Sequence, residues 1–156
     1  MDKILTPKEE KMLNELAAME KTAANTYEYF SNCMKSKGLF GADKFYFAES
    51  RNEHEHYARI AKFMNDLGCE VAMPDQDAID MPDLPLGKTL EVAYKMEKDL
   101  LMKYSQMYDA GRPFIKNFVN EFLTIQTESV GEYGDLINRF KFVGDNVLLF
   151  DQELGK

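Results

Sequence analysis

The sequence has no tryptophan, only two histidines and two cysteines, and no strictly apolar run longer than four residues, such as Val147–Phe150. A membrane-spanning helix needs about 20 predominantly apolar residues, so this chain is not predicted to contain one. Cys33 and Cys69 fit neither a disulfide framework nor a Cys-x-x-Cys metal pattern. The first seven residues contain no apolar secretory core. We therefore expect a reducing, cytoplasmic location.

Positive charge is also scarce. Lys and Arg number 19 against 27 Asp and Glu, which gives a formal net charge of −8. This balance argues against nucleic-acid phosphate or an anionic membrane surface as the main partner. It leaves metal cations open as ligands.

Proline and glycine divide the 156 residues into long uninterrupted stretches. Thr6-Pro7-Lys8-Glu9 is typical of a helix start, with Thr6 as N-cap and Glu9 completing a capping box. The segment 68–87 holds three prolines and several aspartates and has no helical period. The pattern predicts a single all-α domain over residues 1–156, with long helices at about 7–36, 42–67, 88–110 and 113–143 and a short fifth helix within 147–154.

The lengths of the connections predict the topology. The first and third connections are short, so each makes its two helices antiparallel neighbours. The middle connection has about 20 residues, a length unusual in a compact domain unless it has a function. We expect it to cross the full length of the bundle and to give an up-down-down-up four-helix arrangement.

Each long helix carries polar residues on its otherwise apolar face. These residues are Glu20 on the first helix, Glu49, Glu53 and His56 on the second, Glu97 on the third and Gln126 on the fourth. Glu97 and Gln126 lie equally far along the chain from the short corner that joins their helices, so the two should share one level. Glu20 and Glu53, measured in the same way from the corner between the first two helices, differ in level by about one and a half turns. A small shift in the helix ends removes this difference.

Inward carboxylates without a cationic partner would repel one another, and a metal ion would remove that repulsion. Glu53 and His56 are three residues apart and face one way, and with a glutamate from each neighbouring helix they form a set suited to non-haem iron. Taken singly, each residue has a simpler interpretation: a solvent-reaching glutamate, a surface Glu-x-x-His, a core amide at Gln126 or a core aromatic at Tyr27. The joint pattern favours the metal site.

These residues resemble the ferritins, and in particular the bacterial non-haem members. The resemblance covers nearly the whole chain. The segments that carry it are Leu13–Glu15 with Glu20 and Tyr27, Glu49–His56, Tyr94–Glu97, Gln126–Glu128 and Leu149–Leu154.

The resemblance implies an iron-storage protein with ferroxidase activity, which oxidises Fe(II) with O2 or H2O2 and assembles into a hollow 24-subunit shell. It makes Glu20, Glu53, His56 and Glu97 the ligands of a di-iron centre, with Glu53 bridging. Gln126 would be a weaker partner of the second iron. Tyr27 would be the tyrosine that hydrogen-bonds the site and supplies an electron.

The sequence departs from the bacterial pattern at the accessory third iron site. The matching positions are Asn52, Ile125, Glu128 and Ser129, and only Glu128 keeps a carboxylate. The resemblance therefore predicts an absent or weakened third site. Glu49, one turn before Glu53, is an additional carboxylate that leaves a substitute open.

The small number of histidines distinguishes this sequence from other classes of di-iron helical bundle. Enzymes with two Glu-x-x-His motifs need a histidine on the fourth helix, and the stretch 113–143 has none. The alternative from another class is a non-enzymatic four-helix scaffold, or a shell that stores iron without a working ferroxidase centre.

The tail after Gly144 carries a dense apolar load, Val147–Phe150 and Leu154. A segment this short is marginal as an isolated helix. We expect it to pack against tails or surfaces of neighbouring subunits.

Overall fold

The computed structural model describes residues 2–156 except 74, 77, 78 and 80. Its elements are α1 (Pro7–Ser36), α2 (Phe40–Asp66), α3 (Leu86–Ala110), α4 (Pro113–Phe140) and α5 (Val147–Leu154). The described residues contain no β-strand. The all-α prediction and the five predicted helices are thus confirmed.

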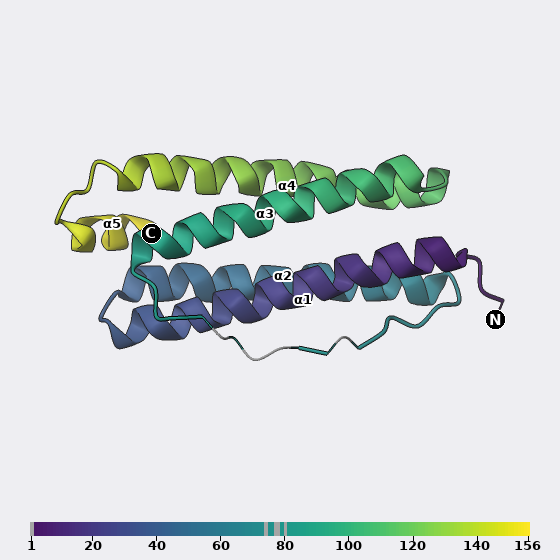
Figure 1. Cartoon of the computed structure of the whole chain (residues 1–156), viewed down its shortest axis with the longest axis horizontal. Coiled ribbons are helices and arrows are strands. Elements are labelled where there is room, and N and C mark those ends of the chain that lie inside the picture. Colours follow the sequence, from purple (N-terminus) through teal and green to yellow (C-terminus); the bar gives the residue numbers. More distant parts are fainter. Residues whose placement is uncertain (1, 74, 77–78, 80) are drawn as a thin grey trace.

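The four long helices form an up-down-down-up bundle, as predicted. Figure 1 shows α1 and α4 running in one direction and α2 and α3 in the other. The connection from α2 to α3 begins and ends at opposite ends of the bundle, and its described parts lie along the outside. Within this connection, Pro74, Asp77 and Asp80 lie outside the described residues. In the part of the chain that is described, no helix is both long and apolar enough to cross a bilayer.

Local capping sets the start of α1. The Thr6 hydroxyl accepts a hydrogen bond from the Glu9 backbone N–H at 3.2 Å, and the Glu9 carboxylate accepts one from the Thr6 N–H at 2.9 Å. Two of the free N–H groups at the helix start are thereby satisfied, as the capping box predicts. Arg112, in the corner between α3 and α4, also donates to both Glu9 carboxylate oxygens, at 2.8 and 2.6 Å. This contact fixes the level of that corner against α1.

The start of α2 was predicted two residues too late. The helix begins at Phe40 and includes Gly41 in its first turn, where N–H groups need no intrahelical partner. The Gly41 and Ala42 N–H groups instead donate to the Asp151 carboxylate on α5, at 3.1 and 2.7 Å. A Cβ at position 41 would lie 1.8 Å from the Asp151 carbonyl oxygen, so α5 can approach this closely only because residue 41 is glycine.

Two other predicted bounds are wrong by two or three residues. α3 begins at Leu86 rather than 88, following Pro85 in the extended conformation that favours a helix start. α4 ends at Phe140 rather than 143, because residues 141–143 close a tight turn in which the Val143 N–H donates to the Phe140 carbonyl. Gly144 follows at φ +59°.

The expectation for the C-terminal tail is wrong in part. Phe150 is buried against Phe140 of the same chain, with ring centroids 5.1 Å apart, and Asp151 is buried at the start of α2. Only Leu148 and Leu149 are left largely exposed, at 62% and 54%. Part of the apolar load therefore packs within the subunit.

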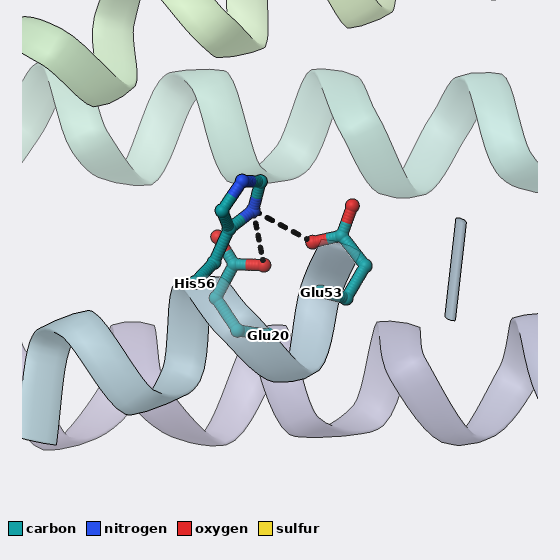
Figure 2. Close-up of side chains that lie close together, drawn as sticks. All are labelled: Glu20, Glu53 and His56. Carbon is teal, nitrogen blue, oxygen red and sulfur yellow. Dashed lines mark hydrogen bonds and ion pairs between the residues drawn. The ribbon is translucent and has the colours of Figure 1, made fainter. Parts of the chain in front are cut away.

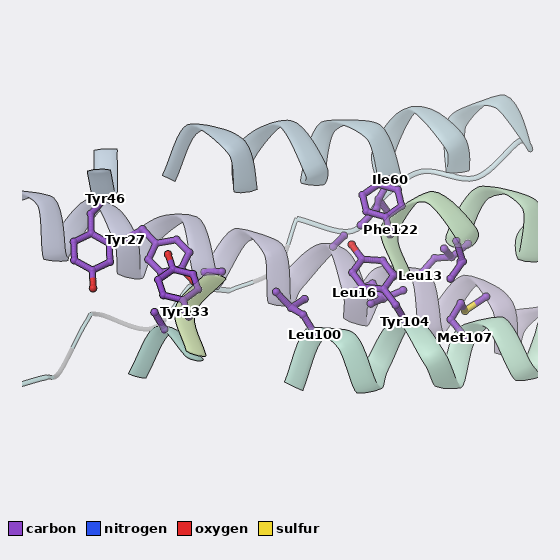
Figure 3. Packing of buried hydrophobic residues seen from close by; sticks show 14 of the residues in the cluster. Leu13, Leu16, Tyr27, Tyr46, Ile60, Leu100, Tyr104, Met107, Phe122 and Tyr133 are labelled. Atoms are coloured by element: carbon purple, nitrogen blue, oxygen red, sulfur yellow. The ribbon is translucent and has the colours of Figure 1, made fainter. Parts of the chain in front are cut away.

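The buried hydrophobic residues form one core, which contains two groups of aromatic side chains. Tyr27, Tyr46 and Tyr133 gather toward one end of the bundle, and Tyr104 and Phe122 pack together toward the other (Figure 3). The buried polar residues Glu20, Glu53, Glu97 and Gln126 belong to the same inner faces. Residues buried this deeply need hydrogen-bond or ionic partners.

Candidate metal centre

The first candidate metal group joins α1 and α2 in the bundle interior. Glu20, Glu53 and His56 each offer a ligand atom, and these atoms all lie within 4.8 Å of one another. Nδ1 of His56 lies 3.3 Å from Oε2 of Glu53 and 3.5 Å from Oε2 of Glu20 (Figure 2). Both carboxylates are buried, so a cation placed here would be held by desolvated ligands.

A second candidate group shares one member with the first. Glu49, Glu53 and Glu97 offer carboxylate oxygens within 4.8 Å of one another. Glu53 belongs to both groups. Its carboxylate thus occupies the position that a ligand bridging two cations would need.

Hydrogen-bond donors surround Glu97. The Tyr27 hydroxyl donates to its Oε1 at 2.6 Å, and the Gln126 side-chain amide donates to its Oε2 at 2.7 Å. Three buried oxygens, Oε2 of Glu20, Oε1 of Gln126 and the hydroxyl of Tyr133, have no hydrogen-bond partner among the described residues. Unsatisfied buried oxygens are rare in folded proteins, and cations bound at the two candidate positions would give the Glu20 and Gln126 oxygens partners.

Crowding shifts the protonation of the three central carboxylates. Burial, and then the charge of Glu20, raise the pKa of Glu53 well above its usual value. Burial also acts to raise the pKa of Glu20, but the neighbouring Glu53 carboxyl, the His56 imidazole and the Tyr104 hydroxyl together outweigh it and hold the pKa below its usual value. Burial raises the pKa of Glu97 despite the Tyr27 and Gln126 donors. The metal-free site therefore disfavours the charged form of Glu53, and a cation bound there would offset this cost.

The chemistry of the donor set fits iron. Four carboxylates, one imidazole and one amide are hard or intermediate donors, and the two groups offer places for two cations about a shared carboxylate. The set matches the inward-facing glutamates and one of the two Glu-x-x-His motifs of ferritin-like carboxylate bundles, and Gln126 stands on the helix that would carry the second.

Comparison with known proteins agrees with this chemistry. The model of the ferritin-like domain family matches residues 10–143, most of the chain. The chain belongs to the ferritin family. A ferritin of Pacifastacus leniusculus is 31% identical over 128 residues, which are 74% of this chain and 69% of that protein. The bacterial non-heme ferritin of Campylobacter jejuni is 25% identical over 141 residues, which are 87% of this chain and 84% of that protein.

Solved structures of ferritins share the fold. An open pore ferritin from Archaeoglobus fulgidus superimposes with a TM-score of 0.88 at 18% identity, covering 97% of this chain and 98% of its own. A structure described as a humanized archaeal ferritin gives a TM-score of 0.91 at 19% identity, with 97% of each chain covered. At such low identity the likeness establishes the bundle architecture of this ferritin and no more.

The structure brings together every residue that the sequence predicted for the site. Glu20, Glu53, His56, Glu97 and Gln126 converge, and Tyr27 contacts Glu97. Their roles as ligands stay a prediction. Of the positions that match the accessory site, Asn52 and Glu128 are exposed, and neither candidate group of the described residues includes them. Glu49, the open substitute, does lie in the second group.

Tyr104 is a further residue of the site, and sequence reasoning gave it no role. Its hydroxyl donates to Oε1 of Glu20 at 2.5 Å. A signal was available in the spacing: Tyr104 follows Glu97 by seven residues, as Tyr27 follows Glu20.

Glu49 gives a pH-dependent prediction for the metal-free protein. Burial, and then the charge of Glu132, raise its pKa from 4.5 to about 7. A raised folded-state pKa favours the protonated acid, so this stability is fully present below about pH 4.5 and is lost as the pH rises through about 7. We expect Glu49→Gln to increase the free energy of unfolding at about pH 8 by about 1–3 kcal/mol and to change it little at about pH 4.5.

Thermal and urea unfolding in the presence of a chelator measure this effect. Glu55→Gln is the matched control, because Glu55 is exposed on the same helix. An equal gain for Glu49→Gln at both pH values would contradict the prediction.

Proposed function

We propose that this ferritin subunit is a ferroxidase that binds two Fe(II) ions, oxidises them to Fe(III) with O2 or H2O2, and passes the product to a ferric mineral stored inside a closed shell of subunits. The observation that carries the proposal is that the two candidate metal groups share Glu53. Membership of the ferritin family supports iron storage as the broader role.

In this proposal the residues divide between two iron ions. Glu20 and His56 bind the first iron, Glu97 and Gln126 bind the second, and Glu53 bridges them. Hard anionic carboxylates stabilise Fe(III) more than Fe(II), which favours oxidation. Two neighbouring Fe(II) ions can give one electron each to a single O2, which takes up two protons and leaves as H2O2.

Gln126 accounts for the release of product. Its side-chain nitrogen donates to Glu97, and its oxygen has no partner among the residues described, so the amide is a neutral donor at the second position. A second iron held by fewer anions is bound more weakly. This suits a centre that must pass its product on to a mineral.

Tyr27 is the catalytic side chain of the proposal. Its phenol contacts Glu97, a ligand of the second iron, and is buried. When O2 is instead reduced fully to two H2O, four electrons are needed. Two come from the paired Fe(II) ions, one from the Tyr27 phenol as its proton moves to Glu97, and one from a third Fe(II), and a later Fe(II) returns the phenoxyl radical to tyrosine. Self-association into a 24-subunit shell and a cytoplasmic location stay predictions from the sequence and the family.

Anaerobic Fe(II) titration followed by admission of O2 tests the function. We expect rapid formation of a ferric species, detected by absorbance, that saturates at two Fe(II) per subunit. Zn(II) added first should compete for the same ligands and suppress the rapid phase. A protein that binds Fe(II) but oxidises it no faster than free Fe(II) in the same buffer would favour the alternative of a scaffold or a shell without a ferroxidase centre.

A further inference from the structure

Two tyrosines bind the carboxylates of the site in a crossed arrangement. Tyr27 on α1 donates to Glu97 on α3 at 2.6 Å, and Tyr104 on α3 donates to Glu20 on α1 at 2.5 Å. Each tyrosine follows the glutamate of its own helix by seven residues, or about two helical turns. Because α1 and α3 run in opposite directions (Figure 1), the two tyrosines come from opposite ends of the bundle, and Figure 3 shows Tyr27 and Tyr104 well apart along its length.

Glu97 and Glu20 differ in how many of their carboxylate oxygens accept a hydrogen bond. Both oxygens of Glu97 accept hydrogen bonds, one from Tyr27 and the other from Gln126. For Glu20, Tyr104 occupies Oε1, while buried Oε2 has no hydrogen-bond partner in the described part of the chain. That free oxygen lies 3.5 Å from Nδ1 of His56, within the first candidate group.

Tyr104 is itself held rigidly. It is fully buried, and its ring stacks on Phe122 at a centroid distance of 5.0 Å and an angle of 9°. Phe122 in turn meets the His56 imidazole edge-on at 5.6 Å, and the Arg59 guanidinium lies 4.5 Å from the centroid of the Phe122 ring. One aromatic side chain therefore contacts both the phenol that orients Glu20 and the imidazole beside its free oxygen.

We propose that Tyr104 is a positioning residue for the first metal position. By occupying Oε1 it limits Glu20 to a single free oxygen, aimed at the space next to His56, so that Glu20 binds a divalent cation through Oε2 alone. The inference rests on the proposed function in that Glu20 is taken as a metal ligand. Partners of this kind, which orient a ligand without touching the metal, typically change metal affinity about 10–100-fold when they are removed.

Co(II) binding to the metal-free full-length protein tests the role without any oxidation step. Its visible absorption reports the number and geometry of its ligands. We expect Tyr104→Phe to weaken binding of the first Co(II) about tenfold. We also expect the visible absorption of Co(II) bound to this variant to lose intensity. A Glu20 carboxylate released from Tyr104 can bind Co(II) through both oxygens and so raise its coordination number.

Two controls separate positioning from a general loss of a buried hydroxyl. Tyr46→Phe removes an equally buried phenolic group whose partner is Thr89, at 2.7 Å, and it should leave the Co(II) spectrum unchanged. In a Glu20→Gln background, Tyr104→Phe should have no further effect on Co(II) binding, because its action passes through that carboxylate. Urea unfolding of each variant verifies that the bundle is intact.

The results discriminate clearly. A parental affinity and spectrum for the first Co(II) in Tyr104→Phe would overturn the role, and so would an equal change in Tyr46→Phe or an undiminished effect in the Glu20→Gln background. Fe(II) oxidation by the parent protein is measured in parallel. If the Co(II) results hold while Fe(II) is not oxidised, the role of Tyr104 stands and the proposed ferroxidase function falls.

Discussion

Replacing Glu53 with alanine should abolish rapid Fe(II) oxidation while leaving the helical bundle intact. Glu53 is the member common to both candidate metal groups, so its loss removes a ligand from each iron at once. Removing a group that merely orients a ligand costs about 10–100-fold, so we expect the initial rate to fall by more than about 100-fold. Stopped-flow absorbance of the ferric product measures this rate.

The same substitution should preserve or increase the stability of the metal-free protein. Burial and the charge of Glu20 raise the pKa of Glu53 well above its usual value, so folding places an energetic cost on the charged form of this carboxyl. Alanine removes that cost and relieves the crowding of carboxylates. Glu53→Gln, which keeps the volume of the side chain, distinguishes this electrostatic effect from the effect of a cavity.

Glu55→Ala, on the exposed side of the same helix, is the control for both measurements and should behave as the parent. If Glu53→Ala oxidised Fe(II) at the parental initial rate, Glu53 would not contribute to the reaction. The assignment of the whole centre would then be wrong.

The parts of the fold that sequence reasoning predicted correctly are those that depend on residues close together in the chain. The Thr6 cap, the apolar stripes and the spacing of Glu53 and His56 are all set within one or two helical turns. The match in level between Glu97 and Gln126 depends only on a short corner. Because each of these features has few degrees of freedom, the sequence pattern determined it.

The level of Glu20 against Glu53 needed the observed helix bounds. With α2 beginning at Phe40, Glu53 lies about 19.5 Å into its helix, and Glu20 lies about 24 Å before the end of α1. The remaining difference is about 4.5 Å along the axis, which two glutamate side chains can span. Placing the start of α2 after Gly41 added about 3 Å to the apparent mismatch, and the contact with α5 explains why the helix begins earlier.

Partners that are distant in the chain were the ones missed. Asp151 caps a helix that starts more than 100 residues earlier, and Tyr104 binds a glutamate 84 residues away. No local pattern names the partner in either contact, although the spacing of Tyr104 after Glu97 repeats that of Tyr27 after Glu20. The N-cap residue of α2, Leu39, has no polar side chain, and this is the only local sign that a cap must come from elsewhere.

Deleting residues 145–156 should lower both the stability of the subunit and its assembly. Within the subunit, the deletion removes the Asp151 cap, worth about 1 kcal/mol, and the buried Phe150 side chain, worth about 2 kcal/mol. We therefore expect the free energy of unfolding to fall by about 3 kcal/mol. At the surface it removes Leu148 and Leu149, which are exposed in the single chain and are proposed to pack against neighbouring subunits.

Two point variants separate these effects, because the capping and the exposed residues of α5 face different surroundings. Asp151→Ala should lower thermal stability by the cap contribution, about 1 kcal/mol, because the Gly41 and Ala42 N–H groups lose their acceptor. Leu148→Ser with Leu149→Ser should leave subunit stability within about 0.5 kcal/mol of the parent, as exposed substitutions usually do. Light scattering after size-exclusion chromatography should nevertheless find smaller or more salt-sensitive assemblies for this double variant. A parent that elutes as an 18.0 kDa monomer, or a double variant that assembles as the parent does, would show that α5 serves only its own bundle.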